Sequence, residues 1–169
     1  MNMTDLFLSE LDREAQRSRR ALEQVPDGKT DWKPHDRSMP FGPLVQMIAG
    51  MPSWFALMIR QDELDIAPKD GPQHRPAPMS TSAELVAGLD QAVADARAAF
   101  QQTTDEHLLT PWRLLAGGKV VMEAPRHVML RDAINHMAHH RGQMTVYLRL
   151  MGATVPALYG PSADDQRFM

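Results

Sequence analysis

The chain has 169 residues, 43% hydrophobic and 23% charged, which is typical of one globular domain spanning residues 1–169. It has 18 lysines and arginines against 21 aspartates and glutamates, and the net charge of −3 offers no excess of positive charge for nucleic acid. It also has no cysteine and seven histidines. Disulfides, zinc–thiolate sites and cysteine nucleophiles are therefore excluded, whereas imidazole chemistry is open.

The N-terminal segment does not look like a secretory signal, because Asp5 and Glu10 interrupt it before any apolar run can form. The uncharged stretch 38–59 contains several prolines and glycines and never reaches the roughly 18 consecutive apolar residues of a membrane span. We therefore expect a cytoplasmic protein without membrane contact, in which that stretch forms a buried helix.

A first helix is expected between residues 4 and 25, because apolar residues recur there at alternating spacings of three and four. Glu14 and Arg17 lie off that stripe. The pattern predicts an amphipathic helix. Its stripe consists of Leu8, Leu11, Ala15, Ser18 and Leu22.

A second helix is expected from Pro43, since proline is tolerated in a first turn, and Pro52 should bend it. Residues 62–79 hold four prolines and several charges, which predicts a surface connection without regular structure. Thr81 and Glu84 have the spacing of a capping box, so a third helix should begin there.

The pattern changes between residues 103 and 125, where Gly117 and Gly118 suggest an irregular crossover with a short hairpin. A last long helix is expected from about residue 127 to 151, with Gly152 as its stop. Four long helices without repeated strand runs favour an all-α four-helix bundle over an α/β sheet.

Two histidines of the last helix form the main candidate site. His136 and His140 lie one above the other, on the arc of apolar residues expected to face the bundle interior. Two imidazoles at this spacing can bind one metal ion, although such a pair also occurs simply as hydrogen-bonded core residues. Asp132 lies four residues before His136 and Gln143 three residues after His140, so either side chain could orient an imidazole. Alternatively, Asp132 could pair with a cation on a solvent-exposed face of the helix.

Two other polar residues of this segment are placed outside the expected site. His139 lies about 60° to one side of the pair, and Arg141 points roughly opposite His139. Neither is expected to bind a metal.

Two C-terminal stretches carry a more specific pattern: Asn-His-x-x-His-His-Arg-Gly-Gln at 135–143 and Val-Pro-x-x-Tyr-Gly-Pro-Ser at 155–162. They resemble the C-terminal signature of the DinB/YfiT-like family. Residues 32–35, residues 44–54 and the region of Trp112 fit the same family in the same order, so the resemblance covers nearly the whole chain.

The resemblance implies an up-down four-helix bundle that forms homodimers and binds a divalent ion such as Zn²⁺ or Ni²⁺ through three histidines. Two of these ligands carry over to His136 and His140. Met47 stands where the family has its third histidine, and a thioether is a poor ligand for such ions. The site is therefore expected to be weakened, with Met47 interpreted as an ordinary core methionine.

Characterised relatives use a small cytoplasmic thiol, which predicts a metal-dependent, thiol-dependent transferase or hydrolase. Without cysteine in the chain, any sulfur nucleophile must arrive with the substrate. The family's name points to a stress response, not to a DNA contact.

The alternative is a non-catalytic bundle that binds a small apolar ligand or a protein partner, with methionines lining the pocket rather than filling the core. Those methionines are Met47, Met51, Met58, Met129, Met137, Met144 and Met151.

Overall fold

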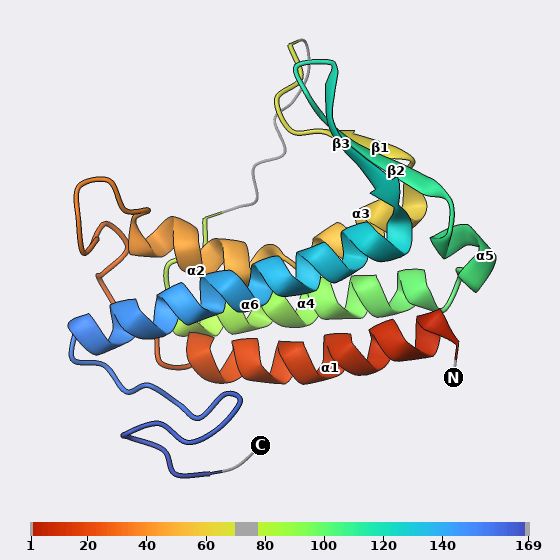
Figure 1. Ribbon diagram of the computed structural model, residues 1–169. Coiled ribbons are helices and arrows are strands. Elements are labelled where there is room, and N and C mark those ends of the chain that lie inside the picture. The colour runs from red at the N-terminus through yellow and green to blue at the C-terminus, as the bar shows by residue number, and fades with distance from the viewer. Residues whose placement is uncertain (1, 70–77, 168–169) are drawn as a thin grey trace.

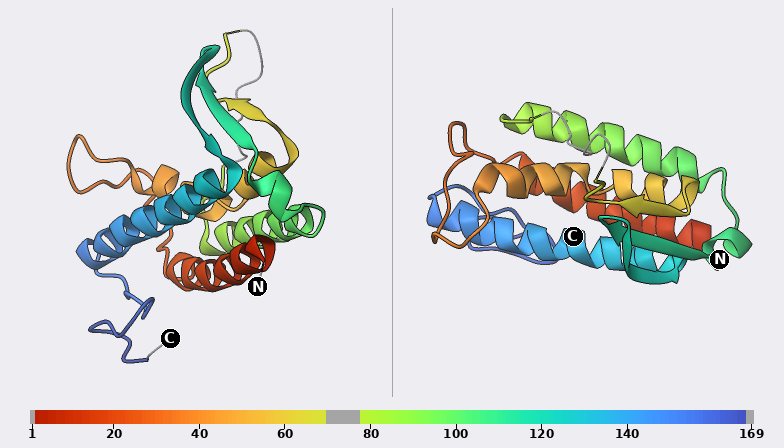
Figure 2. Two further views of the ribbon diagram at one scale, coloured as in Figure 1. Left: turned by 45° about the vertical axis from the view of Figure 1, so that its right-hand side comes forward. Right: turned by 90° about the horizontal axis from the view of Figure 1, so that it is seen from above.

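Helices dominate the part of the chain that the computed structural model describes, residues 2–69 and 78–167. Four helical rods lie side by side, one of them made of two consecutive helices with a bend between them (Figure 1; Figure 2). A small sheet rises from one side of these rods (Figure 1). The elements are α1 (Met3–Leu22), α2 (Phe41–Gly50), α3 (Ser53–Arg60), β1 (Glu63–Asp65), α4 (Ser82–Phe100), α5 (Asp105–Leu108), β2 (Pro111–Ala116), β3 (Lys119–Pro125) and α6 (Arg126–Leu150).

The helix-rich architecture agrees with the sequence analysis, but the expectation of a purely all-α fold is wrong. β2 and β3 form an antiparallel hairpin, and β1 pairs in parallel with β2. The hairpin was predicted, and Gly117 and Gly118 adopt the positive φ values of 61° and 79° that its turn requires. β1 was missed because Glu63–Asp65 becomes a strand only by pairing with Arg113–Leu115, about 50 residues away in the chain. Residues 70–77 of that connection lie outside the described residues.

The helix ends follow the local signals. The Thr81 hydroxyl accepts a hydrogen bond from the Glu84 amide at 3.2 Å, and the Glu84 carboxylate accepts one from the Thr81 amide at 3.0 Å. This confirms the predicted capping box at the start of α4. Pro52 lies at the break between α2 and α3, which meet at an angle of 50°, so the predicted bend is confirmed. Within residues 2–69 and 78–167, no single helix has the length and apolar character needed to cross a membrane.

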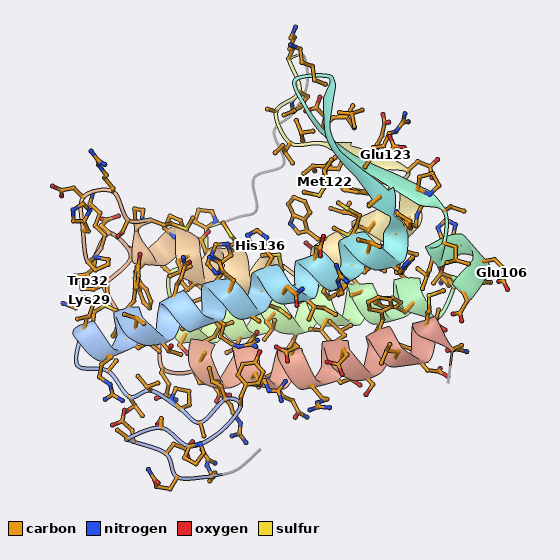
Figure 3. The ribbon with its side chains drawn as sticks, in the orientation of Figure 1. Lys29, Trp32, Glu106, Met122, Glu123 and His136 are labelled. Carbon is orange, nitrogen blue, oxygen red and sulfur yellow. The ribbon has the colours of Figure 1, made fainter. Side chains whose placement is uncertain are left out.

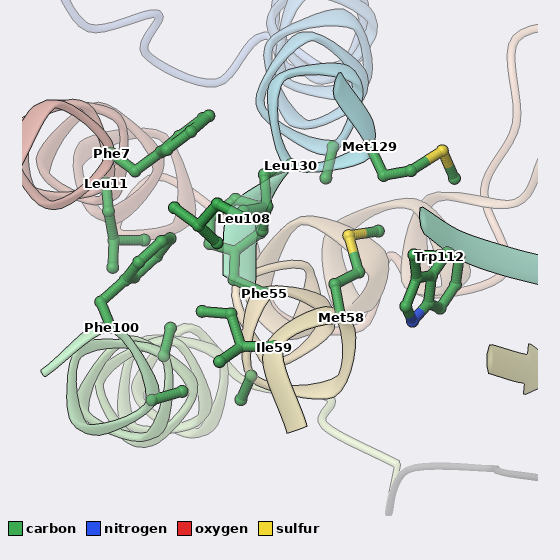
Figure 4. Close-up of a cluster of buried hydrophobic side chains, with 14 residues drawn as sticks. Phe7, Leu11, Phe55, Met58, Ile59, Phe100, Leu108, Trp112, Met129 and Leu130 are labelled. Atoms are coloured by element: carbon green, nitrogen blue, oxygen red, sulfur yellow. The ribbon is translucent and has the colours of Figure 1, made fainter. Parts of the chain in front are cut away.

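The core has two clusters of buried side chains, one toward each end of the bundle. In the cluster nearer the sheet, the rings of Phe7 and Phe100 stack with centroids 5.9 Å apart, and Trp112 joins them from β2 (Figure 4). The other cluster packs α2 against the C-terminal halves of α1 and α6. Along α1 and α6, a buried polar layer separates the two clusters. It consists of Glu14, Arg17, Ser18 and Arg141.

Candidate functional site

The two histidines singled out from the sequence lie together on α6. The Nε2 atom of His140 is 2.7 Å from the Nε2 atom of His136, and the ring centroids are 4.4 Å apart. His140 is buried, at 8% exposure, whereas His136 is exposed. Figure 3 shows His136 on the side of α6 from which the sheet rises. The pair is therefore a preformed contact between two imidazoles with one solvent-facing ring.

The expectation that both imidazoles face the bundle interior is wrong for His136. The buried face of α6 is centred on Met137 and Met144, with His140 toward one edge of it and Arg141 at the other. The buried residues extend farther around the helix, away from His136, than the expected apolar arc does. In the structure His140 lies inside the edge of that face and His136 just outside it.

Gln143 fixes the orientation of the buried imidazole. Its side-chain Oε1 lies 2.8 Å from the Nδ1 atom of His140. A carbonyl oxygen can only accept a hydrogen bond, so Nδ1 carries the proton and the Nε2 atom of neutral His140 keeps its lone pair. His136 is then the donor in the contact between the two Nε2 atoms. This contact is the orienting interaction considered for Gln143 from the sequence.

Asp132, the other residue considered for orienting the pair, lies on a solvent-exposed face of α6. Its side chain is exposed and accepts a hydrogen bond from the neighbouring Arg131 at 3.2 Å. Of the two alternatives for Asp132, the structure therefore shows the pairing with a cation.

The environment of His136 favours its neutral form. Partial removal of the ring from water lowers the pKa of His136, and the neighbouring imidazoles of His140 and His139 lower it further. Neutral imidazole is the form that binds metals. The lowered pKa therefore keeps His136 in the form that can bind a cation.

The pair fits two positions in the coordination sphere of a metal ion. Two imidazole nitrogens on one tetrahedral Zn²⁺ lie about 3.3 Å apart, so the present 2.7 Å contact would have to widen by roughly 0.6 Å. In the described ranges, no group of three or more histidine, cysteine, aspartate or glutamate side chains could hold a metal. An ion at His136 and His140 would therefore need further ligands from solvent or substrate.

Met47 is not an ordinary core residue, contrary to its interpretation from the sequence. α2 turns Leu44 and Ile48 into the core, and Met47 is left half-buried on the flank of the helix. Among the described residues, it packs in neither of the two core clusters.

The opposite edge of the buried face of α6 carries a buried ionic cluster that the sequence analysis missed. Arg141 is fully buried and donates to the Glu14 carboxylate, to the Glu14 carbonyl at 3.1 Å and to the Ser18 hydroxyl at 2.9 Å. From the C-terminal segment, the Tyr159 hydroxyl donates to Glu14 at 2.9 Å, and the Arg17 guanidinium lies 4.2 Å from the Tyr159 ring centroid. Because these charges are buried only through mutual pairing, an apolar pattern cannot reveal them.

Pairing decides the ionisation of Glu14. Burial would raise its pKa, but hydrogen bonds from Arg141, Tyr159 and Arg17, together with the Arg141 charge, outweigh burial and hold the pKa below the ordinary range. The cluster is therefore ionised at neutral pH, and it ties the C-terminal segment and α1 to α6.

A separate buried arginine anchors the sheet. Arg126 donates to the carbonyls of Met58 at 2.8 Å, Pro111 at 2.8 Å and Gln61 at 3.1 Å, and also to the Thr110 and Asp62 side chains. Every guanidinium donor group is thus used. A cavity of about 450 Å³ beside it is lined by Asp62, His107, Thr110, Pro111, Arg113, Glu123 and Arg126.

Comparisons with known proteins agree with this architecture. The model of the DinB family matches residues 1–167. Over 90 residues, 52% of the chain, the sequence is 34% identical to the uncharacterized protein YrdA of Bacillus subtilis (strain 168), and this match covers 51% of that relative. The chain thus spans about half the length of this curated relative.

Two crystal structures share the fold. A DinB-like protein from Bacillus cereus ATCC 10987 has a TM-score of 0.68 and 23% identity, covering 90% of this chain and 95% of that one. The DinB-like protein YjoA from Bacillus subtilis has a TM-score of 0.67 and 21% identity, covering 96% of this chain and 99% of that one. At these identities the two structures support a common fold alone.

Proposed function

Since the chain belongs to the DinB family, we propose that it is a divalent-metal-dependent enzyme of the thiol-dependent transferase or hydrolase type, with His136 and His140 as protein ligands. The observation that carries this proposal is the 2.7 Å contact between the two Nε2 atoms. It places two nitrogens that can bind one cation at a surface that a substrate can reach, because His136 is exposed.

The chain's own residues would bind and orient the reactants. His140 offers its Nε2 lone pair, and His136 does so once its proton moves from Nε2 to Nδ1. When bound, a divalent ion acts as a Lewis acid and lowers the pKa of a thiol or water. A sulfur nucleophile would come from the substrate, because the chain contains no cysteine.

Met47 makes this a weak site in the proposal. Its thioether is neutral and soft, and it occupies the position of the family's third histidine. Its half-buried place on α2, outside the core clusters, means that packing of the core does not require a methionine there.

The alternative of an apolar-ligand pocket has less support. Met51, Met58, Met129, Met137 and Met144 are each at most 4% exposed. Side chains buried to this extent fill the core, so they do not line an open pocket.

Zinc titration of untagged protein tests the proposal. We expect the native chain to bind one Zn²⁺ weakly, the variant Met47→His to bind it at least about tenfold more tightly because a third imidazole is added, and His140→Ala to lose the site. Circular dichroism would verify that each variant is folded. Absence of zinc binding in both the native chain and a folded Met47→His variant would contradict the proposal.

A further inference from the structure

The geometry points to Gln143 as the positioning residue of the histidine pair: its side-chain carbonyl holds the proton of His140 on Nδ1 and so keeps the Nε2 lone pair directed at His136. The metal-binding consequence of this inference rests on the proposed function. The assignment of the His140 proton to Nδ1 does not rest on the proposed function, because the hydrogen bonds that define this tautomer exist without a metal.

The contacts around His140 carry this inference. The ring is buried at 8% exposure, and both of its nitrogens have a partner, Gln143 Oε1 at 2.8 Å and His136 Nε2 at 2.7 Å. A neutral histidine side chain in water prefers its proton on Nε2, which would block that nitrogen as a ligand. An acceptor at Nδ1 favours the other tautomer, and Gln143 is the acceptor there.

The position of Gln143 makes this role separable from folding. The residue lies on the exposed part of α6, three positions after His140, so its replacement opens no cavity in the core. Partners that hold the second nitrogen of a ligating histidine typically change metal affinity about 10- to 100-fold when they are removed. The two histidines of the pair also differ: His140 is already in the metal-binding tautomer, whereas His136 has to change its own.

The test combines NMR with zinc titration of the full chain. In metal-free protein labelled with ¹⁵N-histidine, long-range ¹H–¹⁵N spectra should show an unprotonated Nε2 for His140. In Gln143→Leu, the proton should move to Nε2 and zinc affinity should fall about 10- to 100-fold. Gln143→Glu keeps an acceptor and should restore both properties. Gln91→Leu replaces another exposed helical glutamine, on α4, and should change neither.

The outcomes separate this inference from the proposed function. The positioning role is overturned if Gln143→Leu leaves the His140 tautomer unchanged. It is also overturned if the native chain binds zinc and Gln143→Leu changes the tautomer without weakening that binding. If no protein in the series binds zinc, the proposed function fails. The tautomer spectra then decide by themselves whether Gln143 positions His140.

Discussion

Glu14 of α1 and Arg141 of α6 form an ion pair inside the bundle, with side-chain exposures of 5% and 1%. Arg141 directly follows His140 in the chain and lies about 100° farther around α6, so the two residues belong to opposite edges of one buried face. Together with the apolar side chains of this face, the ion pair holds α6 in a rotation that leaves His136 at the surface and His140 at the edge of the core.

Removing the charge of Glu14 should destabilise the fold strongly. The variant Glu14→Gln leaves Arg17 and Arg141 buried without their carboxylate, and breaking a buried pair in this way costs about 3–5 kcal/mol. The matched control is Glu10→Gln, which removes an exposed pair with Arg13 at 3.9 Å and should cost about 0–1 kcal/mol. Urea unfolding followed by circular dichroism measures both. Equal effects of the two variants would refute the stabilising role of the buried cluster.

The same carboxylate should make stability depend on pH. Because the pKa of Glu14 is lowered in the folded state, the unfolded chain binds more protons as the pH falls through the ordinary range of glutamate, about 4.3. The stability that Glu14 contributes is therefore full above that range and is lost as the pH falls toward the folded-state pKa. The difference in unfolding free energy between the native chain and Glu14→Gln should shrink from about pH 6 to about pH 3. A constant difference over this range would argue against the lowered pKa.

The C-terminal segment should contribute to stability through the hydroxyl of Tyr159. Tyr159→Phe removes hydrogen bonds to the ionised Glu14 and Arg141, and hydrogen bonds to charged groups are worth about 1.5–3 kcal/mol. Tyr147→Phe is the matched control, since the Tyr147 hydroxyl donates to the exposed carbonyl of Met39 at 3.2 Å and should matter less. Thermal unfolding of the two variants distinguishes them, and a smaller effect at Tyr159 than at Tyr147 would contradict the prediction.

Asp65 should hold the tip of the hairpin. Its carboxylate accepts hydrogen bonds from the amides of Gly117 at 3.0 Å, Gly118 at 2.7 Å and Ala67 at 2.9 Å, which lower its pKa. In Asp65→Asn these amides should exchange with deuterium faster, because a neutral amide oxygen is a weaker acceptor than a carboxylate. The amide of Leu85 in α4 is the internal control and should be unaffected. Unchanged exchange at Gly117 and Gly118 would show that the contact does not hold the turn.

Local signals in the sequence were enough for the long helices and the hairpin, whereas the short helix α5 was not predicted. Capping at Thr81, the bend at Pro52 and the turn at Gly117 and Gly118 each depend on residues close together in the chain, and all three are confirmed. β1 depends instead on pairing across about 50 residues, which no local pattern contains.

The candidate site was predictable in its spacing but not in its orientation. The contact between His136 and His140 follows from their positions one helical turn apart. Which side of α6 is buried depends on Arg141, whose burial requires a carboxylate from α1. An apolar pattern counts such a charge as surface, so it does not show how far the buried face extends away from His136.

The central claim is that His136 and His140 together bind a divalent ion. A crystal structure of the untagged, zinc-soaked chain, with anomalous diffraction recorded at the zinc absorption edge, tests it most directly. The account predicts an anomalous peak within about 2.0–2.1 Å of the Nε2 atoms of both histidines. A zinc peak at other residues, such as His107, with the contact between His136 and His140 intact, would contradict it.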